Sequence, residues 1–345
     1  MNQSIEDFEN RKKDHIRLAL DSMSQSKSSS GFGKIRLLHN ALPEIDYKDV
    51  DIKTSLLGQH FSSPHFISSM TAGHGQSFQI NLNLAKAAEK NNWLMAVGSQ
   101  RRELNDTSAS QEWAKIRAQV PHVRLVSNIG ISELISSSLE KILKLTESVQ
   151  SIALIVHLNP LQEVIQDQSN GLFKGGLHAI EHLVKKIKIP VVVKEVGFGI
   201  SEDVVAQLFT AGVHAVDLSG RGGTHWGLIE AAREQSNGLD LDVAEAFIDW
   251  GYSSIDLLLE MQDKILFDRI WASGGIRSGV DSAKCLALGA RAVGIAQPLM
   301  KAAVEGEKDV LRVMKKFDDQ LKVAMFCMGI RTCEGFLHKK VWKCL

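Results

Sequence analysis

Eight short apolar runs, spaced along residues 65–297, constrain the fold of this chain more than any other feature. Most intervals between them have helical periodicity, as in residues 80–91, 131–145, 202–212 and 279–290. Strands that are apolar on both faces and alternate with helices are typical of a parallel sheet. Eight such units in about 250 residues predict a (β/α)8 TIM barrel, and their even spacing favours this closed barrel over a doubly wound sheet. The runs are HFISSM (65–70), LMAVGS (94–99), HVRLVSN (122–128), IALIVHLN (152–159), PVVVKEVG (190–197), HAVDLSG (214–220), RIWASGG (269–275) and AVGIAQ (292–297).

The first 60 residues are predicted to form an N-terminal arm and a pre-barrel segment. A charged helical stretch (11–20) precedes a Ser/Gly-rich connector (22–34), and an irregular stretch (42–58) leads into the barrel. We assign residues 61–345 to the barrel and its C-terminal helices. The longer interval 227–261 is expected to hold an inserted helix or a lid, while the Cys-bearing last 45 residues are expected to serve packing or subunit contacts.

Charge and cysteine usage narrow the class of protein. Forty basic residues balance forty acidic ones, so no global field favours nucleic acid or an anionic membrane as a partner. No apolar run approaches the roughly 20 residues needed to cross a bilayer. The four cysteines form no C-x-x-C pair, and no apolar segment leads the chain. These features predict a soluble cytoplasmic protein.

Polar residues end each of the eight apolar runs. Active sites of barrels form at the C-terminal ends of the strands, so these residues are expected to surround one site. The ends read Ser69-Met70-Thr71, Gly98-Ser99-Gln100-Arg101, Ser127-Asn128, His157-Asn159, Lys194-Glu195, Asp217-Ser219, Ser273-Gly274-Gly275 and Ala296-Gln297.

Two glycine-rich loops follow the sixth and seventh runs, SGRGGTHW (219–226) and SGGIRSG (273–279). Backbone N–H groups of a Gly pair and of a helix N-terminus suit a phosphate, and the last two strands of a barrel are its usual phosphate site. A tight turn alone would also favour glycine. The position of the loops favours a phosphate-bearing cofactor, with Ser219 and Thr224 as further donors.

Three strand-end residues, Ser99, Asn128 and Lys194, can hydrogen-bond the heteroatoms of a flavin ring. A lysine near the pyrimidine end would stabilise an anionic reduced flavin. An ion pair between Lys194 and Glu195 is the alternative. Adjacent strand residues point to opposite faces, which disfavours that pairing.

The stretch VHLNPLQE (156–163) gathers four hydrogen-bonding side chains where an apolar strand stops. His157 and Asn159 share one face of the strand, and the following proline suits the first turn of a helix that brings in Gln162 and Glu163. A lone carboxylate can take one face of a Mg²⁺ completed by water and substrate phosphate. Helix capping is the alternative for Glu163.

Arg11 and Lys12 would bring cations to the same anion from a mobile arm. A solvated charge run is the alternative, and the residues themselves leave it open.

Together these residues resemble the type 2 isopentenyl-diphosphate isomerases, a family of flavin enzymes on a (β/α)8 barrel. The resemblance runs from about Arg11 to Met300. It rests on R-K-K-D-H-I (11–16), L-P-E-I-D-Y-K-D-V-D (42–51), M-T-A-G (70–73), A-V-G-S-Q-R (96–101), S-N-I-G (127–130), H-L-N-x-x-Q-E (157–163), K-E-V-G-F-G-I (194–200), S-G-R-G-G-T (219–224) and S-G-G-I-R (273–277). Ala72 and the loop DQSNG (167–171) depart from the family's pattern.

The resemblance implies a role for each matching residue. Expected FMN contacts are Ser69, Met70, Thr71, Ala72, Ser99, Asn128, Lys194, Ser219, Thr224, Gly274, Gly275, Arg277 and Ala296. Expected substrate contacts are Arg11, Lys12, Ser99, Gln100, Arg101, His157, Asn159 and Gln162. Expected catalytic residues are Gln162, His157 and Lys194, with Mg²⁺ at Glu163. The resemblance also implies a homo-oligomer, commonly a tetramer, and NADPH as reductant.

The implied activity is the interconversion of isopentenyl and dimethylallyl diphosphate by a 1,3-allylic proton shift. An FMN-dependent 2-hydroxy-acid oxidase is one rival, with His225 as its base, but the H-G-x-R context of such a base is missing. A catalytically silent phosphate- or flavin-binding barrel is the other rival. The Gln162-Glu163 pair and the arm disfavour it, because flavin binding alone requires neither.

Overall fold

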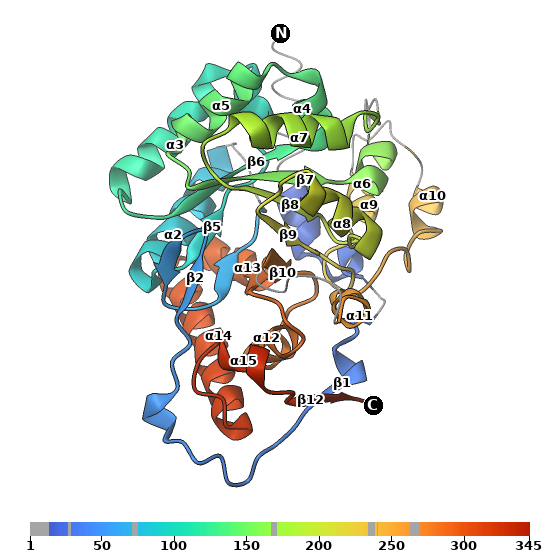
Figure 1. Ribbon diagram of the computed structural model, residues 1–345. Coiled ribbons are helices and arrows are strands. Elements are labelled where there is room, and N and C mark those ends of the chain that lie inside the picture. Colours follow the sequence, from blue (N-terminus) through green and yellow to red (C-terminus); the bar gives the residue numbers. More distant parts are fainter. Residues whose placement is uncertain are drawn as a thin grey trace.

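The computed structural model describes residues 14–26, 29–70, 75–166, 171–233, 239, 241–262 and 269–345. Eight parallel strands form a closed barrel in the order β10-β11-β4-β5-β6-β7-β8-β9, as predicted (Figure 1). Seven of the predicted apolar runs contain one of these strands in full, and the run 122–128 contains most of β6, which continues to Gly130. The strands are β4 (His65–Ile67), β5 (Leu94–Ala96), β6 (Leu125–Gly130), β7 (Ala153–Leu158), β8 (Val191–Glu195), β9 (Ala215–Asp217), β10 (Ile270–Ala272) and β11 (Ala292–Ile295).

Helices surround the barrel, because each strand buries its outward apolar side chains beneath them. The helices are α2 (Gly75–Asn91), α3 (Thr107–Gln119), α4 (Ile131–Ser136), α5 (Leu139–Ser148), α6 (Pro160–Ile165), α7 (Gly176–Lys186), α8 (Glu202–Thr210), α9 (Trp226–Ala231), α10 (Leu241–Glu245), α11 (Ser254–Glu260), α12 (Gly279–Ala287), α13 (Gln297–Glu305), α14 (Glu307–Met328) and α15 (Gly335–His338). Short 3-10 turns are η1 (Ser22–Ser24), η2 (Phe32–Lys34), η3 (Tyr47–Asp49) and η4 (Arg101–Leu104). Helices α9, α10 and α11 account for the predicted insertion at 227–261. In the described part of the chain, no helix is both long and apolar enough to traverse a bilayer.

A hairpin closes the N-terminal end of the barrel. Strands β2 (Thr54–Leu56) and β3 (Gln59–Phe61) pair antiparallel. Leu56 and Phe61 are buried against Phe66 and Trp271, whose side chains belong to the inner apolar cluster of the barrel. The hairpin spans the predicted division at residues 60–61, so the pre-barrel segment shares the barrel's core.

A two-stranded ribbon outside the barrel pairs residues 35–37 with residues 342–344. Strand β1 (Ile35–Leu37) pairs antiparallel with β12 (Trp342–Cys344), and Figure 1 shows them in blue and dark red beside the C-terminus. Helix α14 precedes this ribbon and packs against α2, α12 and α13.

Candidate active site

One cavity of about 360 Å³ opens at the C-terminal ends of the barrel strands. Among the described residues to which the resemblance gave a site role, Gln100 alone does not line it, and the strand-end residues Gly98, Ser127, Glu195 and Asp217 are also absent from its wall. The predicted residues in its wall are Ser69, Met70, Ser99, Arg101, Asn128, His157, Asn159, Gln162, Glu163, Lys194, Ser219, Thr224, Gly274, Gly275, Arg277 and Ala296. Arg11, Lys12, Thr71 and Ala72 lie outside the described residues, as do residues 167–170 of the departing loop.

Strand periodicity explains why these side chains point inward. Val126, Ile155 and Val192 belong to the apolar cluster inside the barrel. Two residues further along each strand come Asn128, His157 and Lys194, so they continue the same inward face. The polar layer of the site therefore lies directly on the apolar filling of the barrel.

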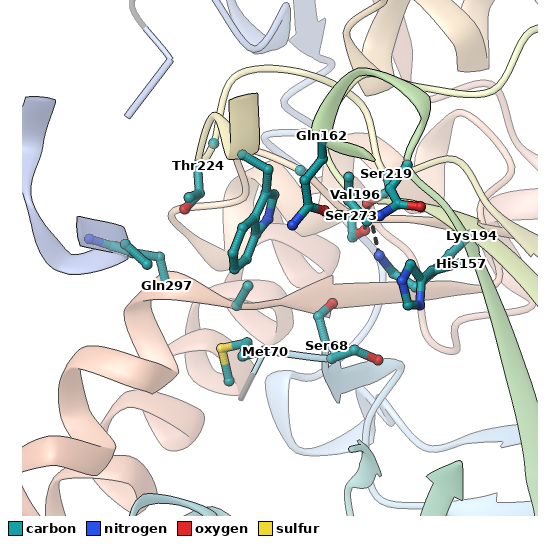
Figure 2. A pocket seen from close by; sticks show the side chains of 18 of the residues that line it. Ser68, Met70, His157, Gln162, Lys194, Val196, Ser219, Thr224, Ser273 and Gln297 are labelled. Atoms are coloured by element: carbon teal, nitrogen blue, oxygen red, sulfur yellow. Dashed lines mark hydrogen bonds between the residues drawn. The ribbon is translucent and has the colours of Figure 1, made fainter. Parts of the chain in front are cut away.

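Lys194 is the centre of a buried polar cluster. It is 5% exposed, and its Nζ lies 3.4 Å from Ser219 Oγ and donates to the carbonyl of Glu195. Ser273 Oγ donates to Asp217 at 2.8 Å and lies 3.1 Å from Ser219 Oγ. Figure 2 shows Lys194, Ser219 and Ser273 together on one side of the cavity, with Ser68 and Met70 across from them.

Burial sets the electrostatics of this cluster. It lowers the pKa of Lys194, and the nearby Asp217 carboxylate opposes this effect. Burial likewise raises the pKa of Asp217, opposed by Lys194 and by the hydrogen bond from Ser273. Each of the two groups thus offsets part of the cost that burial imposes on the charged form of the other.

The two glycine loops pack against each other with no room for side chains. Gly274 has φ 95°, and a Cβ there would overlap the carbonyl oxygen of Gly220. A Cβ on Gly223 would lie 2.9 Å from the backbone nitrogen of Gly275. The close approach brings backbone groups of both loops to the cavity wall, which is the arrangement that phosphate binding requires.

The N-terminal arm covers these loops. Ser26 N donates to Gly223 O at 2.6 Å, and His225 N donates to Ser24 O at 2.8 Å. Gln25 links the loops further, because its Nε2 lies 3.4 Å from Thr224 Oγ1 and its Oε1 accepts from Arg277 at 3.0 Å.

The helical residues 14–20 continue the arm over the cavity. Leu18 and Ala19 pack with Ile229 and Met300, and His15 and Ala19 line the cavity. His15 also stacks edge-on against Trp226, with ring centroids 5.4 Å apart. The arm therefore roofs the cavity.

Carboxylates and amides form a connected group at α6. Asn159 Nδ2 donates to Glu163 Oε1 at 3.1 Å, and Gln166 Nε2 donates to Glu163 Oε2 at 3.0 Å. Gln162 Nε2 donates to Glu230 Oε1 at 2.8 Å. Ionised carboxylates only accept hydrogen bonds, so they fix which way each amide faces.

His157 is oriented by a second chain of hydrogen bonds. Its Nδ1 lies 2.9 Å from Asn128 Oδ1, while Asn128 Nδ2 donates to Val97 O. The amide oxygen of Asn128 therefore accepts from His157, and neutral His157 carries its proton on Nδ1.

The predicted substrate residue Gln100 lies behind this layer. It is 1% exposed, its Oε1 accepts from Asn128 N, and its Nε2 donates to Glu103. Burial raises the pKa of Glu103 to about 7. Gln100 thus supports Asn128 from outside the cavity.

Several wall residues were missed by sequence reasoning. Arg101 Nε lies 3.0 Å from Glu133 Oε1, and Gln162 contacts Glu230 beside Arg233. These residues lie on helices and loops after the strand ends, where the pattern of apolar runs carries no signal. The missed wall residues are Glu133, Gln166, Trp226, Arg233 and Met300, and the buried Glu230 next to them was missed as well. Asp217, which supports Lys194, and Gln297 were among the predicted strand ends but were assigned no role.

His225 would be the base in the hydroxy-acid oxidase alternative. In the structure its imidazole ring hydrogen-bonds to backbone groups instead. Its Nδ1 accepts from Leu228 N at 3.1 Å and caps α9, and its Nε2 bonds the carbonyl of Phe247 at 3.0 Å. Burial lowers its pKa. Both ring nitrogens are thus engaged by the backbone, and His225 is absent from the cavity wall.

Glu195 faces away from Lys194 and organises the next loop. Its Oε2 accepts hydrogen bonds from the backbone N–H groups of Val196, Gly197 and Phe198. Val196 and Gly197 line the cavity. Burial raises the pKa of Glu195 to about 7 in spite of these bonds.

We expect this carboxyl group to make stability fall as the pH rises. Between its ordinary pKa near 4.5 and about 7, folded Glu195 keeps a proton that the unfolded chain has released. A Glu195→Gln variant should therefore lose part of the pH slope of the unfolding free energy, up to roughly 1.4 kcal/mol per pH unit. Urea unfolding from pH 5 to 8 measures it, with exposed Glu140→Gln as control. An unchanged slope would contradict the assignment.

The cavity suits a flavin and a metal by its own chemistry. Ser68 Oγ and Ser69 Oγ are buried without a hydrogen-bond partner among the described residues, opposite Lys194 and the glycine loops. Asn159 Oδ1 is likewise buried and unpaired there, next to Glu163. Within the described ranges, no group of three or more His, Cys, Asp or Glu side chains could hold a metal. A cation at Glu163 would thus need water and substrate oxygens to complete its shell.

Fold and site together define a flavin-type barrel, and comparison with known proteins agrees. The FMN-dependent dehydrogenase family model matches residues 16–124 and 149–343. Solved structures share the fold at low identity. A flavocytochrome b2 variant with benzoylformate aligns with TM-score 0.69 and 20% identity over 96% of this chain and 82% of that one. A mandelate oxidase variant with (S)-mandelic acid aligns with TM-score 0.65 and 16% identity over 97% and 93%.

Curated relatives are much more similar. Isopentenyl-diphosphate delta-isomerase of Bdellovibrio bacteriovorus is 46% identical over 99% of both chains. The protein of that name from Legionella pneumophila (strain Corby) is 44% identical over 98% of this chain and 99% of its own. That of Methanothermobacter thermautotrophicus is 37% identical over 96% and 92%. The chain belongs to the FMN-dependent, type 2 isopentenyl-diphosphate delta-isomerase family, as its motifs indicated.

Proposed function

We propose that this protein interconverts isopentenyl diphosphate and dimethylallyl diphosphate, using reduced FMN and Mg²⁺. One observation carries the proposal: a single cavity contains both the residues expected to hold a flavin and those expected to hold a diphosphate. Full-length identity to relatives named for this activity supports it.

The flavin side of the cavity would hold FMN through the chain's own groups. Gly274, Gly275 and Thr224 would face the phosphate, and Arg277 supplies a cation beside them. Asn128 and Lys194 would contact the ring. When bound, reduced FMN supplies an acid–base group and a negative charge next to the alkene.

The diphosphate side would bind and orient the substrate. Arg101, His157 and Asn159 provide donors, and Glu163 provides one ligand for Mg²⁺. The isomerisation adds a proton at C4 and removes one from C2, through a tertiary cation. Gln162 would orient the reacting carbons, since an amide is too weak a base to remove the proton. The arm would exclude water from that cation.

Two measurements test the proposal. Purified protein should be yellow, or become so with FMN, and anaerobic incubation with isopentenyl diphosphate, Mg²⁺ and NADPH should yield the dimethylallyl isomer. A colourless protein that cannot be reconstituted with FMN contradicts the flavin, and a loaded protein that forms no product contradicts the isomerisation. NADPH as reductant and a homo-oligomer, tetramer favoured, belong to the same proposal.

The metal assignment predicts the behaviour of Glu163→Gln. This variant keeps the side-chain shape but removes a charged ligand, so we expect about a 10–100-fold loss of activity and a higher Mg²⁺ requirement. The flavin absorbance should be unchanged, because Glu163 lies on the diphosphate side. A normal rate with normal Mg²⁺ dependence would remove the assignment.

A further inference from the structure

Arg233 is a buried cation in the cavity wall that the proposed function does not use. It follows α9, its side chain is 9% exposed, and its Nη1 donates to Glu230 Oε2 at 3.3 Å. Its Nε is buried without a hydrogen-bond partner among the described residues.

Glu230 itself is fully buried and joins three elements of the structure. Its Oε1 accepts from Gln162 Nε2 of α6 at 2.8 Å. His15 Nε2 of the arm lies 3.0 Å from the same oxygen. Arg233 holds the other oxygen, so this one carboxylate connects the roof of the cavity to Gln162.

A buried carboxylate such as that of Glu230 needs a positive charge beside it. A carboxylate removed from water is costly unless it is paired with a cation, and otherwise it takes up a proton. A protonated Glu230 would become a donor on one oxygen, and it would no longer fix the direction of the Gln162 amide. It would also lose its attraction for His15.

We propose that Arg233 is a positioning residue that keeps Glu230 a carboxylate, so that Glu230 orients Gln162 and anchors the arm at His15. The part that concerns Gln162 rests on the proposed isomerase function. The part that concerns the arm does not. Arg233 acts through Glu230 and need not touch the substrate.

The kinetic test is a double-mutant cycle of Arg233→Met and Gln162→Leu. We expect Arg233→Met to lower kcat about tenfold with little change in KM, which corresponds to about 1.4 kcal/mol. Because Arg233 acts through the Gln162 amide, it should cost almost nothing further in the Gln162→Leu background. Arg233→Lys keeps the charge and should stay within about threefold of the unchanged protein. Additive losses, or a rise in KM alone that marks a direct substrate contact, would overturn the proposal.

The chain offers a matched control. Arg312 and Asp309 form an ion pair at the same i,i+3 spacing on the exposed face of α14. Arg312→Met should leave kcat unchanged, so a loss confined to Arg233→Met is not a general effect of removing an arginine.

Amide hydrogen exchange of residues 14–20 gives a readout that does not depend on activity. We expect exchange there to quicken about tenfold in FMN-loaded Arg233→Met and to stay unchanged in Arg233→Lys and Arg312→Met. Unchanged exchange in Arg233→Met would refute the anchoring of the arm. Faster exchange in a loaded protein that shows no isomerisation would uphold that anchoring and reject the proposed function.

Discussion

Replacing Lys194 by Met is expected to reduce isomerisation about 10²–10³-fold, the typical cost of losing one preorganised electrostatic group. Lys194 is the buried basic residue on the flavin side of the cavity. Neither of its partners, Ser219 and Asp217, can supply a positive charge in its place. The substitution should also lower the unfolding free energy by roughly 3 kcal/mol, because it leaves Asp217 without its counter-charge. Product formation and urea unfolding measure the two effects.

A second substitution separates the two roles of Lys194. Asn at position 217 keeps an acceptor for Ser273 and for the backbone of Ser219, but it carries no charge. Lys194→Met/Asp217→Asn should therefore regain most of the lost stability while remaining inactive. If activity returns together with stability, Lys194 serves only to neutralise Asp217.

Gly274→Ala is expected to abolish retention of FMN. At φ 95° a side chain is strained, and the added Cβ would overlap the Gly220 carbonyl, so the two glycine loops must move apart. The loops carry the predicted phosphate donors, so we expect the affinity for FMN to fall at least about 100-fold, or about 2.7 kcal/mol. Flavin fluorescence titration of the apoprotein measures this affinity.

Gly33→Ala is the matched control for that experiment. No atom lies within 4 Å of a Cβ built at Gly33, and it is not in the cavity wall. It should bind FMN normally. If Gly274→Ala also bound FMN normally, the phosphate would have to lie elsewhere. Circular dichroism distinguishes a displaced loop from an unfolded barrel.

The barrel could be predicted from sequence because its signal is local. Each strand is a short apolar run, and closure follows from the number and even spacing of the runs. The inward direction of Asn128, His157 and Lys194 also follows from alternation along a strand, which needs no tertiary information. The glycine loops could be predicted from sequence because their backbone conformation and close contacts require glycine, which is visible in the sequence itself.

Site residues that lie on helices and loops beyond the strand ends have no such local pattern in the sequence. Glu230 and Arg233 read as ordinary polar positions at the end of a short helix. Only the fold shows that Glu230 contacts His15 and Gln162 and that Arg233 pairs with Glu230. Gln100 shows the opposite difficulty. It stands at a strand end beside Ser99 and Arg101, yet its amide turns outward to Glu103 and the backbone of Asn128. After a strand ends, the direction of a side chain depends on the conformation of the loop, because the alternation along a strand no longer applies.

The contacts that hold the arm over the cavity come from residues far along the chain, including Gly223, Ile229, Arg277 and Met300. Ribosomal synthesis proceeds from the N-terminus, so the arm emerges before every one of these partners. During synthesis the cavity therefore gains its roof only after the last strands of the barrel have been made.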